Sequence, residues 1–210
     1  MKINNLVFIA GPQGAGKTTL VNLLCGPDVI VPDLVTKTVS LDTNPEMRLA
    51  LKICQRALEN FEYLKIAHTN PEKIVLGNRC IYDQEAFGEV YVRRGWLSQE
   101  TQSHYNQMAK AFYPPELHNP RAIVLNPGFS VVWRHLQHRW QTEQKKWHED
   151  DVLYIQYACK AYERLRDNKN ILYINRELDL RDEDELLPLK NWLKDKTRIS
   201  PEYACTGLTS

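Results

Sequence analysis

Residues 11–18 (GPQGAGKT) have the residue types and the spacing of a loop that binds nucleotide phosphates. Gly11 is followed by four residues and then by Gly16, Lys17 and Thr18. In such a loop the glycines let the backbone approach the phosphates, the lysine reaches the β- and γ-phosphate oxygens, and the hydroxyl binds Mg²⁺. The motif therefore predicts ATP and Mg²⁺ as cofactors, Lys17 as a catalytic residue and Thr18 as the metal ligand. The residues expected to hold the donor are Gly11, Gln13, Gly14, Ala15, Gly16, Lys17, Thr18 and Thr19.

The segments on either side of this loop are the ones that the motif requires. The apolar residues Leu6–Ala10 before it have the length and content of a buried strand. After it, Leu20, Leu23 and Leu24 recur at helical spacing. A loop that joins a strand to a helix turns backbone N–H groups and the helix N-terminus toward one anion. This context distinguishes the motif from a glycine-rich turn with an incidental lysine.

Further along the chain, short apolar stretches alternate with helical patterns. Four more strands are predicted at residues 29–31, 72–79, 121–127 and 170–175. Helices are predicted at residues 82–94, 98–112 and 183–196, and another is marked by an apolar seam of Met47, Leu51, Cys54, Leu58 and Phe61. Such alternation indicates an α/β fold: a parallel five-stranded sheet with helices on both faces, in a single domain of residues 1–210.

Composition limits the classes of function. The 210 residues are 43% apolar, enough for a full core, and the formal net charge of +1 gives no general attraction to nucleic acid. Five scattered cysteines without C-x-x-C spacing indicate reduced thiols and a cytoplasmic setting rather than a metal cluster. We also expect no membrane helix and no signal peptide before the first strand, because no apolar run has the required length.

Features that the sequence lacks favour a small kinase among phosphate-loop proteins. The strand at residues 121–127 ends in Asn126 and Pro127, without the aspartate that binds Mg²⁺ in many NTPases, and no N-K-x-D stretch is present to read guanine. A small kinase needs an acceptor site and cations that close over the phosphoryl group. Residues 131–150 are expected to form a mobile helical lid in which Arg134 and Arg139 stabilise charge. The alternative is a solvated basic helix, and the tryptophans of this segment are expected to pack on the body.

Together these parts resemble the deoxyribonucleoside kinase and thymidylate kinase superfamily over most of the chain. The phosphate loop is similar to the first motif of that family, and NRCIYDQEAFGEVY at residues 78–91 resembles its Glu-Arg-Ser motif with the helix behind it. VPDLV at residues 31–35 lies where the family has a short acidic-proline segment, with proline and acid in reversed order. The resemblance implies a P-loop kinase fold, an ATP·Mg²⁺ donor and an acceptor of the nucleoside type.

The resemblance also implies roles for single residues. Asp33 matches the general base for an acceptor hydroxyl, Arg79 the arginine that holds phosphate and acceptor, and Gln55 the glutamine that reads the acceptor base. Arg134 and Arg139 match the family's arginine-rich lid, and Arg176 falls where the family has its adenine-contacting loop. Asn78 replaces the family glutamate that helps to organise Mg²⁺ or the acceptor sugar.

Several of these residues also have plainer interpretations. Asp33 could cap a turn, Arg79 could be a surface arginine, and Gln55 could lie on any helix surface. Asp83 and Glu85 could contact Mg²⁺ through water, or could simply be first-turn residues that the helix dipole favours.

Three functions remain open on the sequence. The first is ATP-dependent phosphoryl transfer to a deoxynucleoside or a nucleoside monophosphate, in which Asp33 acts as a base only for a hydroxyl acceptor. The second is a kinase that phosphorylates a hydroxyl of a modified base or nucleotide within DNA, which the near-neutral net charge disfavours. The third is a nucleotide-dependent switch or binding module with slow hydrolysis, which Asp33 and the lid arginines disfavour. The family likeness adds the expectation of a homodimer, which the apolar seam at residues 47–61 would allow.

Overall fold

The computed structural model describes residues 4–34, 39–40, 43–143, 147–179 and 181–195. These residues form a five-stranded sheet in the order β2-β3-β1-β4-β5, in which every neighbouring pair is parallel. The strands are β1 (Leu6–Ala10), β2 (Val29–Ile30), β3 (Ile74–Asn78), β4 (Arg121–Leu125) and β5 (Ile171–Ile174). The predicted α/β fold with a parallel five-stranded sheet is confirmed.

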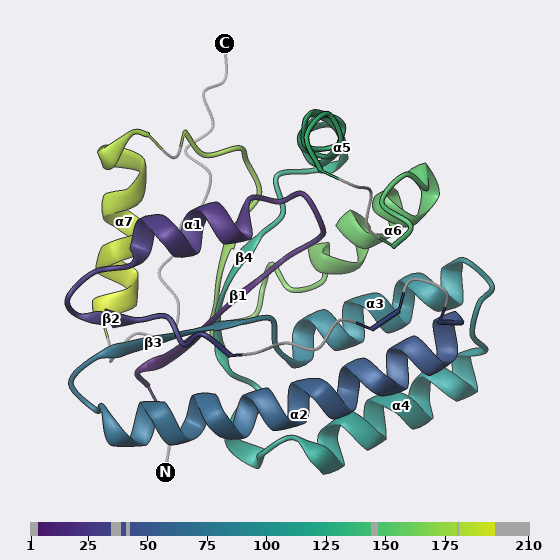
Figure 1. The fold of residues 1–210 in the computed structure, drawn as a ribbon, viewed down its shortest axis with the longest axis horizontal. Coiled ribbons are helices and arrows are strands. Elements are labelled where there is room, and N and C mark those ends of the chain that lie inside the picture. Colours follow the sequence, from purple (N-terminus) through teal and green to yellow (C-terminus); the bar gives the residue numbers. More distant parts are fainter. Residues whose placement is uncertain (1–3, 35–38, 41–42, 144–146, 180, 196–210) are drawn as a thin grey trace.

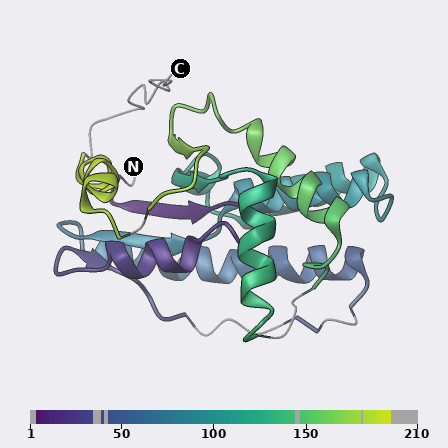
Figure 2. The same cartoon turned by 90° about the horizontal axis from the view of Figure 1, so that it is seen from above.

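Helices cover both faces of this sheet, as predicted. Figure 1 shows α1 and α7 on one side of the strands and α2, α3 and α4 on the other, and Figure 2 shows α5 lying across the end of β1. No described helix is both long enough and apolar enough to cross a lipid bilayer. The helices of the described residues are α1 (Lys17–Leu24), α2 (Pro45–Thr69), α3 (Ile81–Arg93), α4 (Gln99–Phe112), α5 (Phe129–Arg139), α6 (Val152–Glu163) and α7 (Glu183–Lys194), with a 3₁₀ turn at Pro115–Leu117.

The middle strands β1 and β4 are buried along their whole length and, apart from Arg121, are apolar, because both of their faces are covered. All residues of β1 and β4 are buried, as is typical of a parallel sheet between two layers of helices. Phe8 contacts Tyr63 of α2 edge-on, with the ring centroids 5.7 Å apart. Gly77 in β3 leaves room for this ring, since a Cβ there would lie 2.5 Å from atoms of Phe8. The core therefore fixes the position of β1 and of the loop that follows it.

The strand β1 lies in the centre of the sheet, and the chain changes direction around it. It passes from β1 to β2 and β3 on one side, and then crosses to β4 and β5 on the other. In such a sheet a crevice forms at the carboxyl end of the central strand, and ligands bind there. Residues 11–16 follow β1 at this point, so the topology places the phosphate loop at the crevice.

The segment predicted as a lid, residues 131–150, consists of most of α5 and of the connection toward α6. Helix α5 ends at Arg139, and α6 begins after Asp151, whose side chain accepts a hydrogen bond from the backbone N–H of Tyr154. Trp133 and Trp140 pack on each other, with ring centroids 5.4 Å apart. Residues 144–146 lie outside the described part of the chain. The motion of this segment as a lid stays a prediction.

The predicted helix around residues 47–61 is present as α2, but its apolar seam does not face the core. Met47, Leu51, Leu58 and Phe61 are 52%, 43%, 72% and 57% exposed. The helix instead packs on the sheet through a different stripe, made by Leu49, Ile53, Ala57, Asn60, Tyr63, Leu64 and Ala67. The spacing therefore identified the helix but not its buried face. A homodimer through the exposed seam stays a prediction.

Candidate active site

The loop between β1 and α1 is pressed between two other elements. Gly11 has a φ of 140° and Gly14 a φ of 78°. A Cβ on Gly11 would lie 2.1 Å from the carbonyl oxygen of Leu125 at the end of β4, and a Cβ on Gly14 would lie 2.8 Å from the side chain of Leu136 on α5. Both the backbone conformation and the lack of space therefore require glycine at these positions.

The loop and the first turn of α1 fit the phosphates of a nucleotide. The Nζ atom of Lys17 donates to the carbonyl oxygens of Gly11 and Pro12 at 2.8 and 2.6 Å. Burial, and next the positive charge of Arg79, lower the pKa of Lys17 well below its ordinary value. Negative phosphates beside the ammonium would oppose this shift. Thr18 lies exposed in the first turn of the helix, where N–H groups without a helical partner attract anions.

A metal ion at this loop would rely on Thr18 and on the nucleotide. Within the described residues, no group of three or more His, Cys, Asp or Glu side chains is placed to hold a metal. Mg²⁺ fits this arrangement because it keeps several waters and needs few protein ligands besides substrate phosphates. Of the two acidic candidates nearby, Glu85 pairs with Arg164 at 3.3 Å, and Asp83 has the structural contacts described below.

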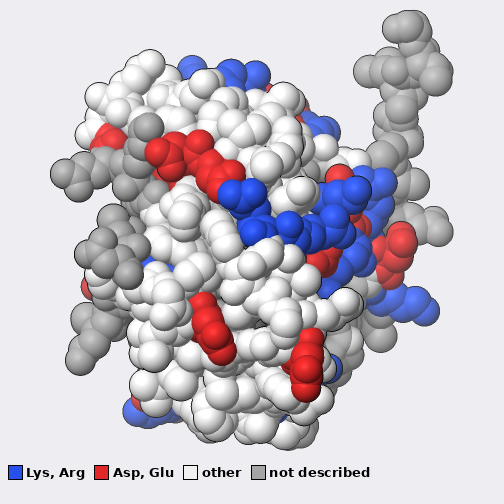
Figure 3. Space-filling view, turned by 90° about the vertical axis from the view of Figure 1, so that its right-hand side faces the viewer, with Lys and Arg blue, Asp and Glu red and all other residues white. Residues whose placement is uncertain are grey.

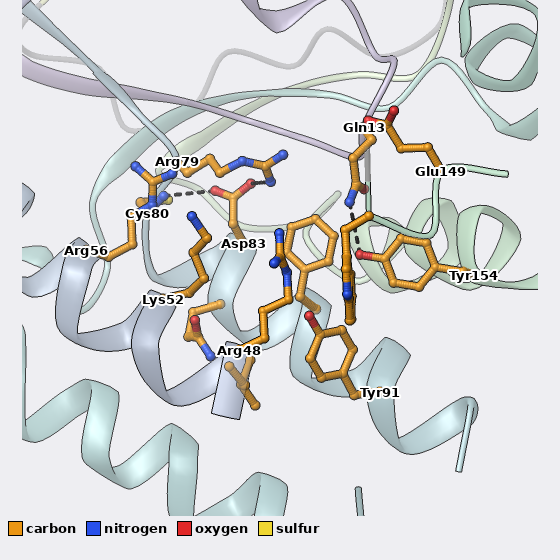
Figure 4. A pocket seen from close by; sticks show the side chains of 14 residues that line it. Gln13, Arg48, Lys52, Arg56, Arg79, Cys80, Asp83, Tyr91, Glu149 and Tyr154 are labelled. Carbon is orange, nitrogen blue, oxygen red and sulfur yellow. Dashed lines mark hydrogen bonds and ion pairs between the residues drawn. The ribbon is translucent and has the colours of Figure 1, made fainter. Parts of the chain in front are cut away.

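A cavity of about 230 Å³ lies between the phosphate loop, α2, α3 and the segment that leads into α6. Gln13 is the residue of the phosphate loop that lines the cavity. Its side-chain amide donates a hydrogen bond to the Tyr154 hydroxyl at 2.9 Å. Figure 4 shows polar side chains from these elements pointing into the same space. The apolar part of the wall is mainly aromatic: Phe87, Tyr91, Trp147 and Tyr154 line the cavity together with Leu49.

Three cations of α2 line this cavity in a row, which we call the α2 cation row: Arg48, Lys52 and Arg56 (Figure 4). They are four residues apart, so they share one face of the helix and follow each other at about 6 Å. Arg48 donates to the carbonyl oxygens of Val39 and Ser40 at 3.2 and 3.0 Å, and its guanidinium lies 4.6 Å from the centre of a Trp147 ring.

The other two members of the row are held differently. The Lys52 ammonium donates to the side-chain oxygen of Gln55 at 2.9 Å. Arg56 forms an ion pair with Glu59 and donates to the carbonyl oxygen of Asn78 at 2.8 Å. Burial, followed by the charges of Arg56 and Arg48, lowers the pKa of Lys52 to about 8. Like charges are thus crowded at this wall, and an anion in the cavity would relieve their repulsion.

The carboxylate of Asp83 connects three parts of the site. Its Oδ1 atom accepts from the Tyr162 hydroxyl at 2.6 Å, from Arg79 at 3.1 Å and from the backbone N–H of Gly11 at 3.4 Å. Its Oδ2 atom accepts from the backbone N–H of Cys80 at 2.8 Å, which caps the start of α3. Asp83 is 3% exposed. The sequence indicated a first-turn or metal-linked acid here, and the structure places it as the counter-ion of Arg79.

Arg79 reaches the cavity from the end of β3, as its position after a strand predicted. Its backbone has a φ of 66°, a left-handed conformation that is uncommon for residues other than glycine. The backbone N–H still donates to the carbonyl oxygen of Ile9 at 3.1 Å, so the chain pairs with β1 while it turns. The guanidinium lies over the ring of Phe87, 4.9 Å from its centre. Such strained conformations are concentrated at functional sites.

Two residues with expected substrate roles lie outside the cavity wall. Asp33 is exposed after β2 and is not among the residues that line the cavity. Gln55 lies on α2 between Lys52 and Glu59, with its amide nitrogen 2.8 Å from the Glu59 carboxylate, and it does not line the cavity either. Their catalytic and base-reading roles stay predictions.

The lid arginines and Arg176 are engaged in ion pairs. Arg134 lies 2.5 Å from Glu177, Arg139 lies 2.5 Å from the buried Glu149, and Arg176 lies 2.6 Å from Glu185. Arg139 approaches the cavity through Glu149, which lines it. The pair of Arg134 with Glu177 joins α5 to the segment after β5, in which Arg176 also lies. Their roles toward a donor nucleotide also stay predictions.

Sequence reasoning missed the α2 cation row and the place of Trp147. The basic residues four apart are visible in the sequence and could have been recognised as one helix face. Trp147 was expected to pack on the body, and it does contact Tyr91 and Trp96, with centroids 5.3 and 5.5 Å apart. Trp147 also forms part of the cavity wall. This position could not be predicted, because it depends on contacts with residues that are distant in the sequence.

We predict that Asp83→Asn lowers the free energy of unfolding by about 2–3 kcal/mol, because an amide would turn an N–H₂ group toward donors and leave Arg79 without its counter-ion. Urea denaturation measures the change. The matched control is Asp28→Asn, which alters an exposed carboxylate and should shift stability by less than about 0.5 kcal/mol. Equal stabilities of the two variants would contradict the role assigned to the Asp83 contacts.

Comparison with known proteins adds a likeness of fold. No protein-family model matches the sequence, and no curated protein sequence matches it. Among solved structures, the chain is similar to the deoxyadenosine kinase from M. mycoides with bound dATP, with a TM-score of 0.65 and 17% sequence identity. The matched region covers 90% of this chain and 98% of that one. The likeness shows that this chain has the fold of that P-loop nucleoside kinase.

Proposed function

We propose that the chain is a nucleotide kinase, which transfers the γ-phosphoryl group of ATP to a nucleoside monophosphate. The observation that carries the proposal is the α2 cation row, which lines a cavity next to Gln13 of the phosphate loop. The phosphate loop and the fold support the phosphoryl transfer in general. The row supports an acceptor that already has negative charge.

The charges around the cavity argue against a neutral acceptor. Of the two carboxylates in the wall, Asp83 contacts Arg79 and Glu149 contacts Arg139. Among the described residues, Arg48 and Lys52 have neutral partners, namely backbone carbonyls and an amide. A neutral nucleoside would displace water from these cations without compensating them, which is unfavourable. A phosphate dianion would compensate them.

The chemistry then needs no general base. An ionised oxygen of the acceptor phosphate attacks the γ-phosphorus of ATP, and the bond from that phosphorus to the β–γ bridging oxygen breaks, so that ADP leaves. Mg²⁺, when bound by Thr18 and the donor phosphates, neutralises charge on the transferred group. In this proposal Arg79 holds the acceptor phosphate, and Lys17 holds the donor phosphates. The exposure of Asp33 is compatible with this scheme.

The aromatic wall is suited to the acceptor base. Trp147 offers flat apolar surface near Arg48, with Tyr91 beside it, and Phe87 offers such a surface near Arg79. Bases stack on such rings. Gln84 also lines the cavity, is 6% exposed, and its side-chain nitrogen has no hydrogen-bond partner among the described residues. We therefore propose Gln84, rather than Gln55, as the amide that reads the base.

The α2 cation row gives the main test. Lys52→Met should lower kcat/KM for nucleoside monophosphates roughly 10²-fold by removing a charge-assisted contact, while the KM for ATP stays unchanged. Steady-state assays with labelled ATP and a panel of nucleosides and monophosphates measure this. The control is Lys65→Met, an exposed lysine on the same helix. If wild-type enzyme prefers free nucleosides and ignores the Lys52 change, the acceptor is not a monophosphate.

The same lysine gives a pH dependence. Because the pKa of Lys52 is lowered to about 8, the ammonium is charged below that pH and becomes neutral above it. The KM for the acceptor should therefore rise between about pH 7 and pH 9 in the wild type, as attraction for the phosphate is lost. In Lys52→Met the KM should be higher and nearly constant over this range. A wild-type KM that falls with rising pH would contradict the assignment.

Asp33→Asn distinguishes a phosphate acceptor from a hydroxyl acceptor. An ionised phosphate needs no base, so kcat should stay within about threefold of the wild type. Loss of a general base would instead lower kcat by about 10² or more. Such a loss, with an unchanged KM for ATP, would identify a hydroxyl as the group that is phosphorylated and would restore Asp33 as the base.

A kinase that acts on DNA is the second candidate. The α2 cation row extends over about 12 Å, longer than one phosphate needs, and Figure 3 shows Lys and Arg side chains gathered in a band on one face. Transfer to DNA that falls steeply between about 50 and 200 mM salt would favour this candidate over a small acceptor. ATP hydrolysis that is independent of every acceptor would instead indicate the nucleotide-dependent switch.

A further inference from the structure

One face of α5 packs on the phosphate loop. The side chain of Leu136 and the carbonyl oxygen of Val132 lie against Gly14, 2.8 and 3.0 Å from where a Cβ of that residue would be. The Nδ1 atom of His135 lies 3.0 Å from the carbonyl oxygen of Gly14. Arg139 follows Leu136 by three residues and His135 by four, so its side chain leaves the helix on the same face. The helix therefore directs Arg139 toward the loop that is expected to bind the donor.

The charge of Arg139 acts on Lys17. Burial first and the charge of Arg79 next lower the pKa of the Lys17 ammonium, and the charge of Arg139 lowers it further. Such an effect weakens with distance and is largely screened beyond about 10 Å. Arg139 therefore lies near the lysine that is expected to reach the β- and γ-phosphate oxygens, as the face of the helix also indicates.

Two carboxylates contact Arg139, and they differ in burial. The Nη2 atom of Arg139 lies 2.5 Å from Oε2 of Glu149, whose side chain is 1% exposed. Its Nε atom lies 3.8 Å from Oε2 of Glu143, whose side chain is 52% exposed. Both of these nitrogen atoms are shielded from water. A solvated ion pair does little to hold a side chain in place, whereas a buried charge depends strongly on its partner. Glu149 is therefore the carboxylate that fixes the guanidinium.

Glu149 also belongs to the cavity wall, which it lines together with Gln13 of the phosphate loop (Figure 4). Its ion pair with Arg139 thus connects the donor loop with the cavity proposed for the acceptor. Arg134, the other arginine of α5, differs, because its pair with Glu177 is largely exposed and can be exchanged for a contact with phosphate. Of the two arginines, Arg139 is the one whose position is fixed before a nucleotide binds.

A cation that is held in place contributes to catalysis differently from one that is free to move. A mobile arginine settles on the phosphates of the bound donor, which lowers the energy of the ground state as well as that of the transition state. A fixed arginine needs no reorganisation at the moment of transfer, when charge on the phosphoryl group reaches its position. An ion pair of this kind would direct the charge of Arg139 to the transfer step rather than to donor binding.

We propose that Glu149 is a positioning residue, which holds the Arg139 guanidinium beside the phosphate loop so that it stabilises the phosphoryl group during transfer. The inference rests on the proposed function in one respect, namely that phosphoryl transfer takes place at this loop. It adds a division of roles: Arg139 touches the transferred group, and Glu149 acts through Arg139. Without the Glu149 charge, the guanidinium moves onto the phosphates of bound ATP, so that donor binding is kept and the rate of transfer falls.

Glu149→Gln tests the inference, because it removes the charge and keeps the size of the side chain. At saturating acceptor, kcat should fall about tenfold or more, while the Kd for a non-hydrolysable ATP analogue with Mg²⁺ stays within about threefold of the wild type or decreases. Steady-state assays with labelled ATP measure kcat, and calorimetry measures the Kd. The matched control is Glu143→Gln, which removes the other carboxylate near the same arginine and should change kcat by less than about twofold.

Two further measurements separate positioning from stability. Glu149→Asp keeps the negative charge but withdraws it by one methylene, and it should lower kcat by an intermediate amount even where Glu149→Gln does not fold. Guanidinium ion, added far below the concentrations that unfold the protein, should restore part of the kcat of Arg139→Ala. It should not restore the kcat of Arg139→Ala combined with Glu149→Gln, because the carboxylate that places the ion is then missing.

Equal kcat values of Glu149→Gln and Glu143→Gln overturn the inference, and so does a wild-type kcat in Glu149→Asp. Rescue by guanidinium that does not depend on Glu149 overturns it equally, as does a weaker affinity for the analogue with an unchanged kcat. In each of these cases, transfer by the wild type leaves the proposed function intact. A wild-type protein that transfers no phosphoryl group to nucleosides or monophosphates overturns the proposed function itself, and the inference with it.

Discussion

The buried carboxylate of Asp83 holds together parts of the site that come from separate regions of the chain. It receives hydrogen bonds from the loop after β1, from the start of α3, from Arg79 and from the hydroxyl of Tyr162 on α6. A carboxylate that is nearly excluded from water needs such donors, because an unpaired buried charge is strongly destabilising. The same bonds fix the direction of the Arg79 guanidinium. Without this anion, the positive charges of Arg79 and Lys17, which repel each other, would lose a compensating charge.

The parts of the site that follow directly from local sequence were predictable. The phosphate loop lies between a strand and a helix that are both recognisable from their sequence patterns. Arg79 follows a strand whose carboxyl end must face the crevice. The α2 cation row was not recognised because basic residues four apart on a single helix are typical of a solvated face. Only the packing of α2 beside α3 and Trp147 encloses them. Gln55 precedes Arg56 by one residue, and that step of about 100° on a helix moves it off the cavity wall.

Other parts depend on contacts that sequence patterns do not encode. The network of Asp83 requires Tyr162, 79 residues away. The position of Asp33 depends on the path of the chain between β2 and α2, whose described residues 31–34, 39–40 and 43–44 form no helix or strand. The ion pairs of Arg134 and Arg139 were likewise not foreseen. The pair of Arg134 with Glu177 is largely exposed, so it is weak and easily replaced by a stronger anion such as a phosphate. In contrast, Glu149 is buried, and its contact with Arg139 is harder to exchange.

The close fit of Gly14 against Leu136 has a consequence for sequence variation. A larger residue at position 14 would collide with Leu136. A larger residue at position 136 would displace the loop that precedes α1. Neither position can therefore change freely while the other is fixed. In a set of homologous sequences, the two columns should covary in side-chain volume, although they are separated by more than half of the chain. Such covariation would show that the contact between α5 and the loop limits which residues are accepted at both positions during evolution.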